Sequence, residues 1–344
     1  MNNVNQKIMN AIIEKAEKVC PDSLAFIGIY GSVVTGDEYE KSDLDLLILI
    51  QDDKGWQLGT GFILDDSNVG YDIYCTNWNG LKYDAAYHHA QISKLMDSKI
   101  VYIKNQEAYN ELCKLREQTK LFLASEERFQ RVNELVDKAK ISYANACLHE
   151  ELGEVRLDAF LVMYFLMDAI MLFHGKYFKR GTKRILEELA ALPMEDVFID
   201  NLKSIASSKD VLELRALLKS LLLYTERHLK QEKEKEEPSE SLSGTYEEMY
   251  SNWRNKVEEA AKQNNVFASF MNMCNLHYMF SEISSKVSIG AYNIMEKYSS
   301  DCLENNVNLF DACLQKYETV YKTAGITIKR FHNVDEFVAD YLEN

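Results

Sequence analysis

Ile29–Ile48 has the sequence IYGSVVTGDEYEKSDLDLLI, in which two apolar stretches flank a turn and a pair of aspartates. The apolar residues 24–30 predict a buried strand, and residues 44–50 predict a second one. Gly31 permits a tight turn into a short helix and lets a phosphate approach the backbone closely. Ser32 can cap that helix or hydrogen-bond a phosphate oxygen. The turn therefore predicts a phosphate site, with Gly31, Ser32 and Ser42 as candidate nucleotide-binding residues.

Asp43 and Asp45 stand at the start of the second strand, ten residues after the Gly-Ser turn. Side chains at i and i+2 of a strand point to the same face, so the two carboxylates lie side by side and need a cation between them. Carboxylate oxygens suit Mg²⁺, which completes its coordination with water and substrate phosphates. Asp72, between Tyr71 and Ile73 on a further expected strand, is the candidate third metal ligand or a general base.

These residues resemble the signature of the DNA polymerase β-like nucleotidyltransferase superfamily. The form from Gly31 to Leu46 is similar to its small bacterial branch, which includes antibiotic nucleotidyltransferases and the minimal nucleotidyltransferases of toxin–antitoxin pairs. The resemblance covers about the first third of the chain. Many members carry an arginine two or three residues after the serine. Here Val33, Val34 and Thr35 occupy those places, so no arginine next to Ser32 contacts phosphate.

The following helical region resembles, with less specific motifs, the bundle of kanamycin nucleotidyltransferase. In that family a helix delivers a glutamate base to the substrate hydroxyl just before a glycine. The matching stretch, His149–Arg156, is expected to close a long helix, and Glu150 is the position that matches the base, with Glu151 as its competitor. This resemblance makes an aminoglycoside or a similar antibiotic the leading acceptor.

The pattern along the 344 residues predicts an α+β fold. Strands and helices alternate over residues 1–104, as in a small nucleotidyltransferase domain with a mixed sheet and flanking helices, and residues 85–96 are expected to be one helix. Residues 105–230 show only helical periodicity, which predicts a bundle that binds the acceptor. The charged residues 231–244 predict a linker. Residues 245–344 form an additional helical region, whose aromatic and Met residues predict core or homodimer contacts.

The amino-acid composition limits the kinds of partner that we expect the protein to bind. A net charge of -15 disfavours a nucleic-acid partner, which needs clustered Lys and Arg, and suits a cationic small molecule. Seven cysteines without Cys-x-x-Cys spacing, and an N-terminus without an apolar signal core, predict a reduced cytoplasmic protein with no membrane segment. The basic stripe of Lys176, Lys179, Arg180, Lys183 and Arg184 is interpreted as a solvated face rather than an anion site, and His88 and His89 as surface residues.

Three functions remain open. The first is a Mg²⁺-dependent enzyme that moves AMP from ATP, or another nucleoside monophosphate, onto a hydroxyl of a small molecule. In it Asp43, Asp45 and Asp72 bind metal and Glu150 or Asp72 accepts the proton. The second is a protein-modifying or antitoxin-type nucleotidyltransferase, against which the additional helical regions argue. The third is a non-catalytic nucleotide-binding regulator, against which the complete set of carboxylates argues.

Overall fold

The computed structural model describes residues 3–230 and 234–343, and the chain divides into two compact units. Unit 1 ends at Lys230 and unit 2 follows it. Unit 1 holds two small sheets and most of the helices. The strands of both sheets all lie before residue 104. The fold is therefore α+β, as the sequence predicted.

The four-stranded sheet of unit 1 has the order β5-β2-β1-β6. β1 runs antiparallel to both β2 and β6, and β5 is parallel to β2. β3 and β4 form a separate antiparallel ribbon. The strands span β1 Leu24–Ile29, β2 Leu46–Ile50, β3 Thr60–Leu64, β4 Val69–Ile73, β5 Cys75–Thr76 and β6 Lys99–Ile103.

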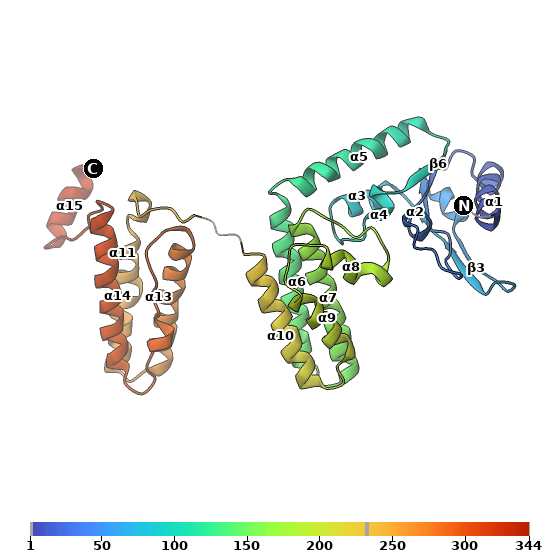
Figure 1. The fold of residues 1–344 in the computed structure, drawn as a ribbon. Helices are drawn as coiled ribbons and strands as arrows, with labels where there is room; N and C mark the ends of the chain where they lie inside the picture. The colour runs from blue at the N-terminus through green and yellow to red at the C-terminus, as the bar shows by residue number, and fades with distance from the viewer. Residues whose placement is uncertain (1–2, 231–233, 344) are drawn as a thin grey trace. The chain divides into compact units, whose positions relative to one another are not determined.

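Both faces of the central strands are buried, which explains their unbroken apolar sequences. Leu46, Ile48 and Ile50 pack against α1 (Asn3–Val19) and the β3–β4 ribbon. Leu47 and Leu49 point the other way and pack against α3 (Trp78–Ala85), α4 (Ser93–Met96) and α5 (Gln106–Ala124). The sheet thus lies between α1 with the β3–β4 ribbon on one face and α3, α4 and α5 on the other (Figure 1).

Residues 85–96, expected to be one helix, are not one. α3 ends at Ala85 and α4 starts at Ser93. Between them Tyr87 takes a positive φ of 53° and is fully buried, and its hydroxyl donates to the Lys176 carbonyl at 2.7 Å. Phe178 N donates to the Ala90 carbonyl at 2.9 Å. These contacts with a distant segment outweigh local helix propensity here.

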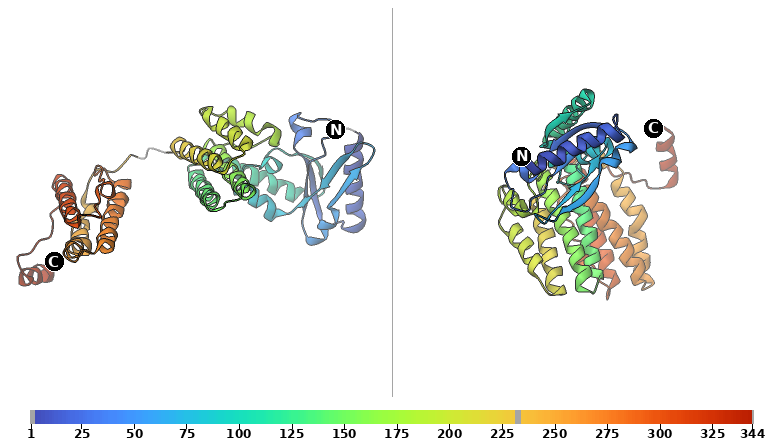
Figure 2. Two further views of the ribbon diagram at one scale, coloured as in Figure 1. Left: turned by 90° about the horizontal axis from the view of Figure 1, so that it is seen from below. Right: turned by 90° about the vertical axis from the view of Figure 1, so that its right-hand side faces the viewer.

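The helical part of unit 1 packs its apolar faces into one core. α6, α7 and α10 lie roughly parallel to each other in Figures 1 and 2. The helices span α6 Arg128–Leu148, α7 Leu152–Phe173, α8 Ile185–Ala190, α9 Val197–Ser207 and α10 Val211–His228, and a 3₁₀ turn covers Thr182–Arg184.

Unit 2 is helical and has its own core. Residues 231–244 were expected to be a linker, but part of this segment belongs to unit 2. Glu236 forms an isolated parallel β-bridge with Val287, and the Leu242 side chain is buried. The helices span α11 Thr245–Met249, α12 Asn255–Lys262, α13 Val266–Lys286, α14 Leu303–Thr323 and α15 Val334–Glu343, and Tyr250–Arg254 is π-helical. Over the described part of the chain, the length and apolar character needed to cross a membrane are not met by any helix.

Candidate functional site

The end of β1 meets the start of β2, which brings the Gly-Ser turn against the aspartate pair. Ile29 pairs with Leu46 in the antiparallel ladder, and Tyr30 N donates to the Asp45 carbonyl at 3.1 Å. The turn continues into α2 (Ser32–Thr35), which is a single helical turn. Tyr30 and Asp45, which are 15 positions apart in the sequence, therefore become neighbours.

Gly31 has a structural reason to be glycine. Its φ is 68°, and a Cβ atom there would lie 1.9 Å from Oδ2 of Asp45. The backbone N–H of Ser32 donates to the same Asp45 carboxylate. From the sequence, a phosphate was expected to approach the backbone of Gly31 this closely. In the structure the Asp45 side chain occupies that position, so Gly31 and Ser32 orient the carboxylate.

The charges at this turn shift the pKa of two side chains. Burial and the nearby Asp43 carboxylate raise the pKa of Asp45 to about 6. Burial and the charges of Asp45, Asp84, Asp43 and Asp72 raise the pKa of the Tyr30 hydroxyl above its ordinary value. Negative charge therefore concentrates around the Tyr30 side chain, and a cation bound there would relieve the repulsion.

A cavity of about 410 Å³ opens beside this turn. Gly31, Ser32, Ser42, Asp43 and Asp45 line it. Residues 179–184, which follow α7 and which we call the strap, line it as well. The strap contributes four cations to the cavity, Lys179, Arg180, Lys183 and Arg184. The basic stripe, interpreted from the sequence as a solvated face, therefore lines the same cavity as the aspartates.

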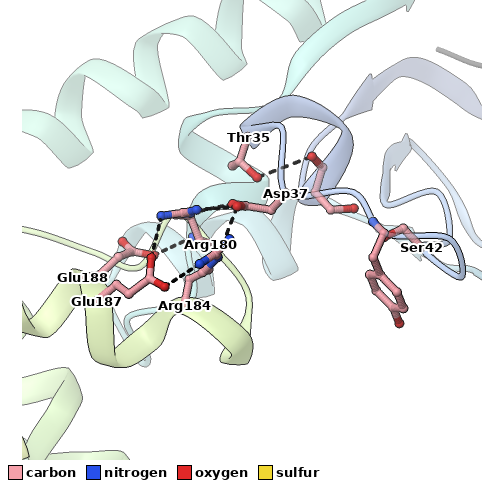
Figure 3. A network of polar contacts seen from close by, with 9 residues as sticks. Thr35, Asp37, Ser42, Arg180, Arg184, Glu187 and Glu188 are labelled. Atoms are coloured by element: carbon pink, nitrogen blue, oxygen red, sulfur yellow. Dashed lines mark hydrogen bonds and ion pairs between the residues drawn. The ribbon is translucent and has the colours of Figure 1, made fainter.

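Asp37 fastens the strap to the loop after α2 (Figure 3). Arg180 forms a bidentate pair with Asp37, with Nε 2.5 Å from Oδ2, and Arg184 Nε lies 3.3 Å from Asp37 Oδ1. The Arg180 guanidinium lowers the pKa of the Asp37 carboxyl. Glu188 accepts hydrogen bonds from the backbone N–H groups of Lys179 and Arg180 at 3.0 and 2.8 Å. The strap is thus held by both its backbone and its arginines.

The two strap lysines lie against aromatic rings. The Lys183 ammonium lies 5.6 Å from the ring centre of Tyr39, and that of Lys179 lies 5.7 Å from the ring centre of Tyr177. Arg180 and Arg184, in contrast, are also paired with Glu187. Within residues 3–230, these two lysines are the strap cations for which no salt bridge is formed, so their charge is available to an anion in the cavity.

Ser42 shapes the approach to Asp43. Tyr39 N donates to Ser42 Oγ at 2.9 Å, and Ser42 N donates to the Tyr39 carbonyl at 2.9 Å. This reciprocal pair closes the loop just before the aspartates. Ser42 therefore lines the cavity, as its candidate role requires, while its hydroxyl is already used within the loop.

Asp72 lies on β4, opposite Gly61 of β3. Its side chain is exposed, whereas Tyr71 and Ile73 are buried, so the predicted alternation of faces is confirmed. Asp43 and Asp72 line a second, shallower hollow together. The structure therefore brings Asp72 to the edge of the site, next to Asp43.

The oxygen donors of this site suit a hard cation such as Mg²⁺. Among the residues that the structure describes, no three His, Cys, Asp or Glu side chains are grouped closely enough to hold a metal. Mg²⁺ is commonly held by one or two carboxylates and completes its shell with water and substrate phosphates. Asp43 and Asp45 supply such a pair in the lining of the cavity. The Asp45 carboxylate occupies the space that Gly31 leaves open.

Glu150 is not brought to the cavity. α6 ends at Leu148, and Glu150 lies in the turn before α7 rather than on a helix. The opposite end of α7 is the one that meets the sheet domain, because Lys176 and Phe178 contact Tyr87 and Ala90. The 22 residues of α7 span roughly 33 Å at 1.5 Å per residue. The assignment of Glu150 as the base is therefore corrected: Glu150 lies at the far end of the bundle.

Comparison with known proteins finds likenesses among the solved structures. No protein-family model matches the chain, and no curated protein matches it. The crystal structure of a nucleotidyltransferase-like protein from Exiguobacterium sibiricum 255-15 is similar over 66% of this chain and 78% of that chain. The two chains are 14% identical, and the TM-score is 0.33. At this level of similarity, function has to be inferred from the residues of the cavity.

Proposed function

We propose that unit 1 is a nucleotidyltransferase that uses a nucleoside triphosphate and a divalent cation. The observation that carries this proposal is that carboxylates and unpaired cations line one cavity. Asp43 and Asp45 line it together with Lys179 and Lys183. A metal-bound triphosphate needs both: carboxylates for the metal and cations for the phosphate oxygens.

In this proposal the residues of the cavity have different roles in the transfer. Asp43 and Asp45 would hold Mg²⁺, which when bound neutralises triphosphate charge and orients the reacting phosphoryl group. The strap lysines would bind the outer phosphates, which leave as pyrophosphate. Asp45 is placed by the Ser32 amide and by Gly31, so its carboxylate is oriented before the nucleotide arrives.

The acceptor in this proposal is a hydroxyl of a small molecule. Its oxygen forms a bond to the α-phosphorus, the bond from that phosphorus to the bridging oxygen of the β-phosphate breaks, and pyrophosphate departs. The hydroxyl proton passes to Asp72, which is exposed beside Asp43 and takes the place of Glu150 as the proposed base. ATP as the donor and a cationic, aminoglycoside-like acceptor follow from the sequence resemblance and from the net charge of -15.

The experiment is a turnover assay with the full chain, Mg²⁺ and each of ATP, GTP, CTP and UTP, with and without a panel of aminoglycosides. We expect pyrophosphate release that depends on an acceptor and falls about a thousandfold in Asp43→Ala, because a bound metal contributes several kcal/mol. Asp65→Ala, an exposed carboxylate in the β3–β4 turn, is the matched control and should retain wild-type turnover.

Each other outcome selects a different function. If the nucleotides are labelled, accumulation of the label on protein would favour a protein-modifying enzyme. Nucleotide binding without turnover across the acceptor panel would favour the non-catalytic regulator. If none of the four nucleotides binds in the presence of Mg²⁺, the proposal is wrong.

A further inference from the structure

Asp84 is a buried carboxylate directly behind the cavity. It lies on α3 and is 3% exposed. Its Oδ2 is 3.2 Å from Lys94 Nζ, and its Oδ1 is 3.3 Å from His89 Nε2. A carboxylate this buried is costly unless it is paired, and breaking such a pair leaves an uncompensated charge. His89, interpreted from the sequence as a surface residue, is thus part of a buried cluster.

Lys94 connects this cluster to the cavity. It lies on α4 and lines the cavity together with Gly31, Ser32 and Asp45, and its side chain is 22% exposed. The charges of Asp84 and Asp45 both act on Tyr30, which places Lys94 and its partner close to the aspartates. The strap supplies further cations to the same cavity.

We propose that Lys94 contacts a non-bridging phosphate oxygen of the bound nucleoside triphosphate and that Asp84 is its positioning residue. The proposal rests on the proposed nucleotidyltransferase function. Val33, Val34 and Thr35 provide no cation next to Ser32, so the charge on this side of the triphosphate has to come from elsewhere. Lys94 is a cation of the α/β domain in this cavity, and Asp84 fixes its ammonium group there.

A purely structural ion pair makes a different prediction. If Lys94 served only to neutralise Asp84, its replacement would change stability without distinguishing a phosphorylated ligand from an unphosphorylated one. The test must therefore compare ligands that differ only in their phosphates, and it must measure binding as well as turnover.

The experiment is calorimetric titration of the full chain with ATP, GTP, CTP and UTP in Mg²⁺, and with the matching nucleosides. A charged hydrogen bond contributes enough that Lys94→Gln should weaken triphosphate binding about 10- to 100-fold. Nucleoside binding should be unchanged. Lys94→Arg keeps the charge and should restore most of the affinity. Lys82→Gln removes an exposed lysine of α3 and should bind as the wild type does.

A double-mutant cycle tests the role of Asp84. Asp84→Asn should weaken triphosphate binding at least about threefold when Lys94 is present and should have no further effect in the Lys94→Gln background. Thermal unfolding of every variant checks that it is folded. If Asp84→Asn does not fold, the comparison of Lys94→Gln with Lys94→Arg still decides the role of Lys94.

The outcomes separate this inference from the function on which it rests. Loss of triphosphate binding in Asp43→Ala, together with wild-type binding in Lys94→Gln, would overturn the role of Lys94 alone. Equal effects of Asp84→Asn in both backgrounds would overturn the positioning role. A wild-type chain that binds no triphosphate would overturn the proposed function and the role of Lys94 with it.

Discussion

Unit 1 and unit 2 bury different kinds of polar side chains. The buried carboxylates of unit 1 are Asp84, Asp158 and Asp168, whereas the buried polar residues of unit 2, within residues 234–343, are Ser269 and Asn306. Those two are neutral and hydrogen-bond each other at 3.1 Å. Buried charge lowers stability unless it is compensated, so a fold keeps it mainly where chemistry needs it. Asp84 is paired with Lys94, which lines the cavity, whereas Asp158 and Asp168 do not line it, so Asp84 is the buried carboxylate that connects this contrast to the proposed chemistry.

The largest effect that we expect comes from Gly31. Gly31→Ala places a Cβ 1.9 Å from the Asp45 carboxylate at a positive φ. We expect a loss of about 3 kcal/mol or more in the unfolding free energy of unit 1, because strain and the clash add. Urea denaturation followed by Trp56 and Trp78 fluorescence in a Trp253→Phe background reports on unit 1 alone.

Gly36 is a control for the cost of a positive φ, although its ψ of 20° is left-handed α-helical, whereas the ψ of -149° at Gly31 lies in a region that essentially only glycine adopts. Gly36 also has a positive φ, of 74°, but a Cβ there would meet no atom within 4 Å. Gly36→Ala should therefore cost only about 1 kcal/mol, the cost of the backbone conformation alone. Equal losses for the two variants would contradict the conclusion that the Asp45 carboxylate determines the glycine at position 31.

The buried Tyr321 of unit 2 provides the opposite test, because its hydroxyl is neutral and hydrogen-bonded. The Tyr321 hydroxyl donates to the Leu242 carbonyl at 2.5 Å and accepts from Tyr246 N at 2.9 Å. Tyr321→Phe leaves both backbone groups without this partner, so we expect unit 2 to lose about 2 kcal/mol of unfolding free energy. Trp253 fluorescence in a Trp56→Phe/Trp78→Phe background measures it.

Tyr321→Phe should not alter nucleotide binding by unit 1. Tyr278→Phe, at a tyrosine that is 67% exposed, is the control and should be neutral for stability. A change in triphosphate affinity in Tyr321→Phe would show that the two units are coupled, and the contrast between a chemical and a structural unit would have to be abandoned.

The sequence was sufficient where a local pattern determines the structure. The strands β1 and β2 follow from unbroken apolar runs, and the exposure of Asp72 follows from alternation along β4. The pairing of β1 with β2 then places Gly31 beside Asp45. These features depend on residues within about twenty positions of one another, which is the range that periodicity describes.

The sequence was insufficient where distant residues decide the structure. The break at Tyr87 depends on the Lys176 carbonyl, and the strap depends on Asp37, which is 143 residues from Arg180. A basic stripe alone does not reveal that it faces a cavity. One signal was present in the sequence: Val33, Val34 and Thr35 leave the turn without a cation, so a cation in this cavity has to come from elsewhere in the chain.

The smallest effect that we expect concerns a buried charge that the proposed chemistry does not use. Asp168 lies on α7, is 1% exposed and accepts a hydrogen bond from Ala90 N. Burial raises its pKa to about 7. The folded state therefore holds the proton more tightly than the unfolded state does, and ionisation above pH 7 destabilises the fold. Asp168→Asn keeps an acceptor for Ala90 N and removes that cost.

Asp168→Asn should therefore stabilise unit 1 by about 1–2 kcal/mol at pH 8, and this gain should shrink as the pH falls through 7 and vanish near pH 4, where both proteins are neutral at this position. Denaturation of both proteins across this pH range, followed by Trp56 and Trp78 fluorescence in the Trp253→Phe background, measures the difference. A gain that does not depend on pH would mean that the pKa of Asp168 is the same in the folded and unfolded states, so that burial does not raise it. A loss at pH 8 would mean that the carboxylate contributes to stability through its charge, and buried charge in unit 1 would then no longer mark a cost.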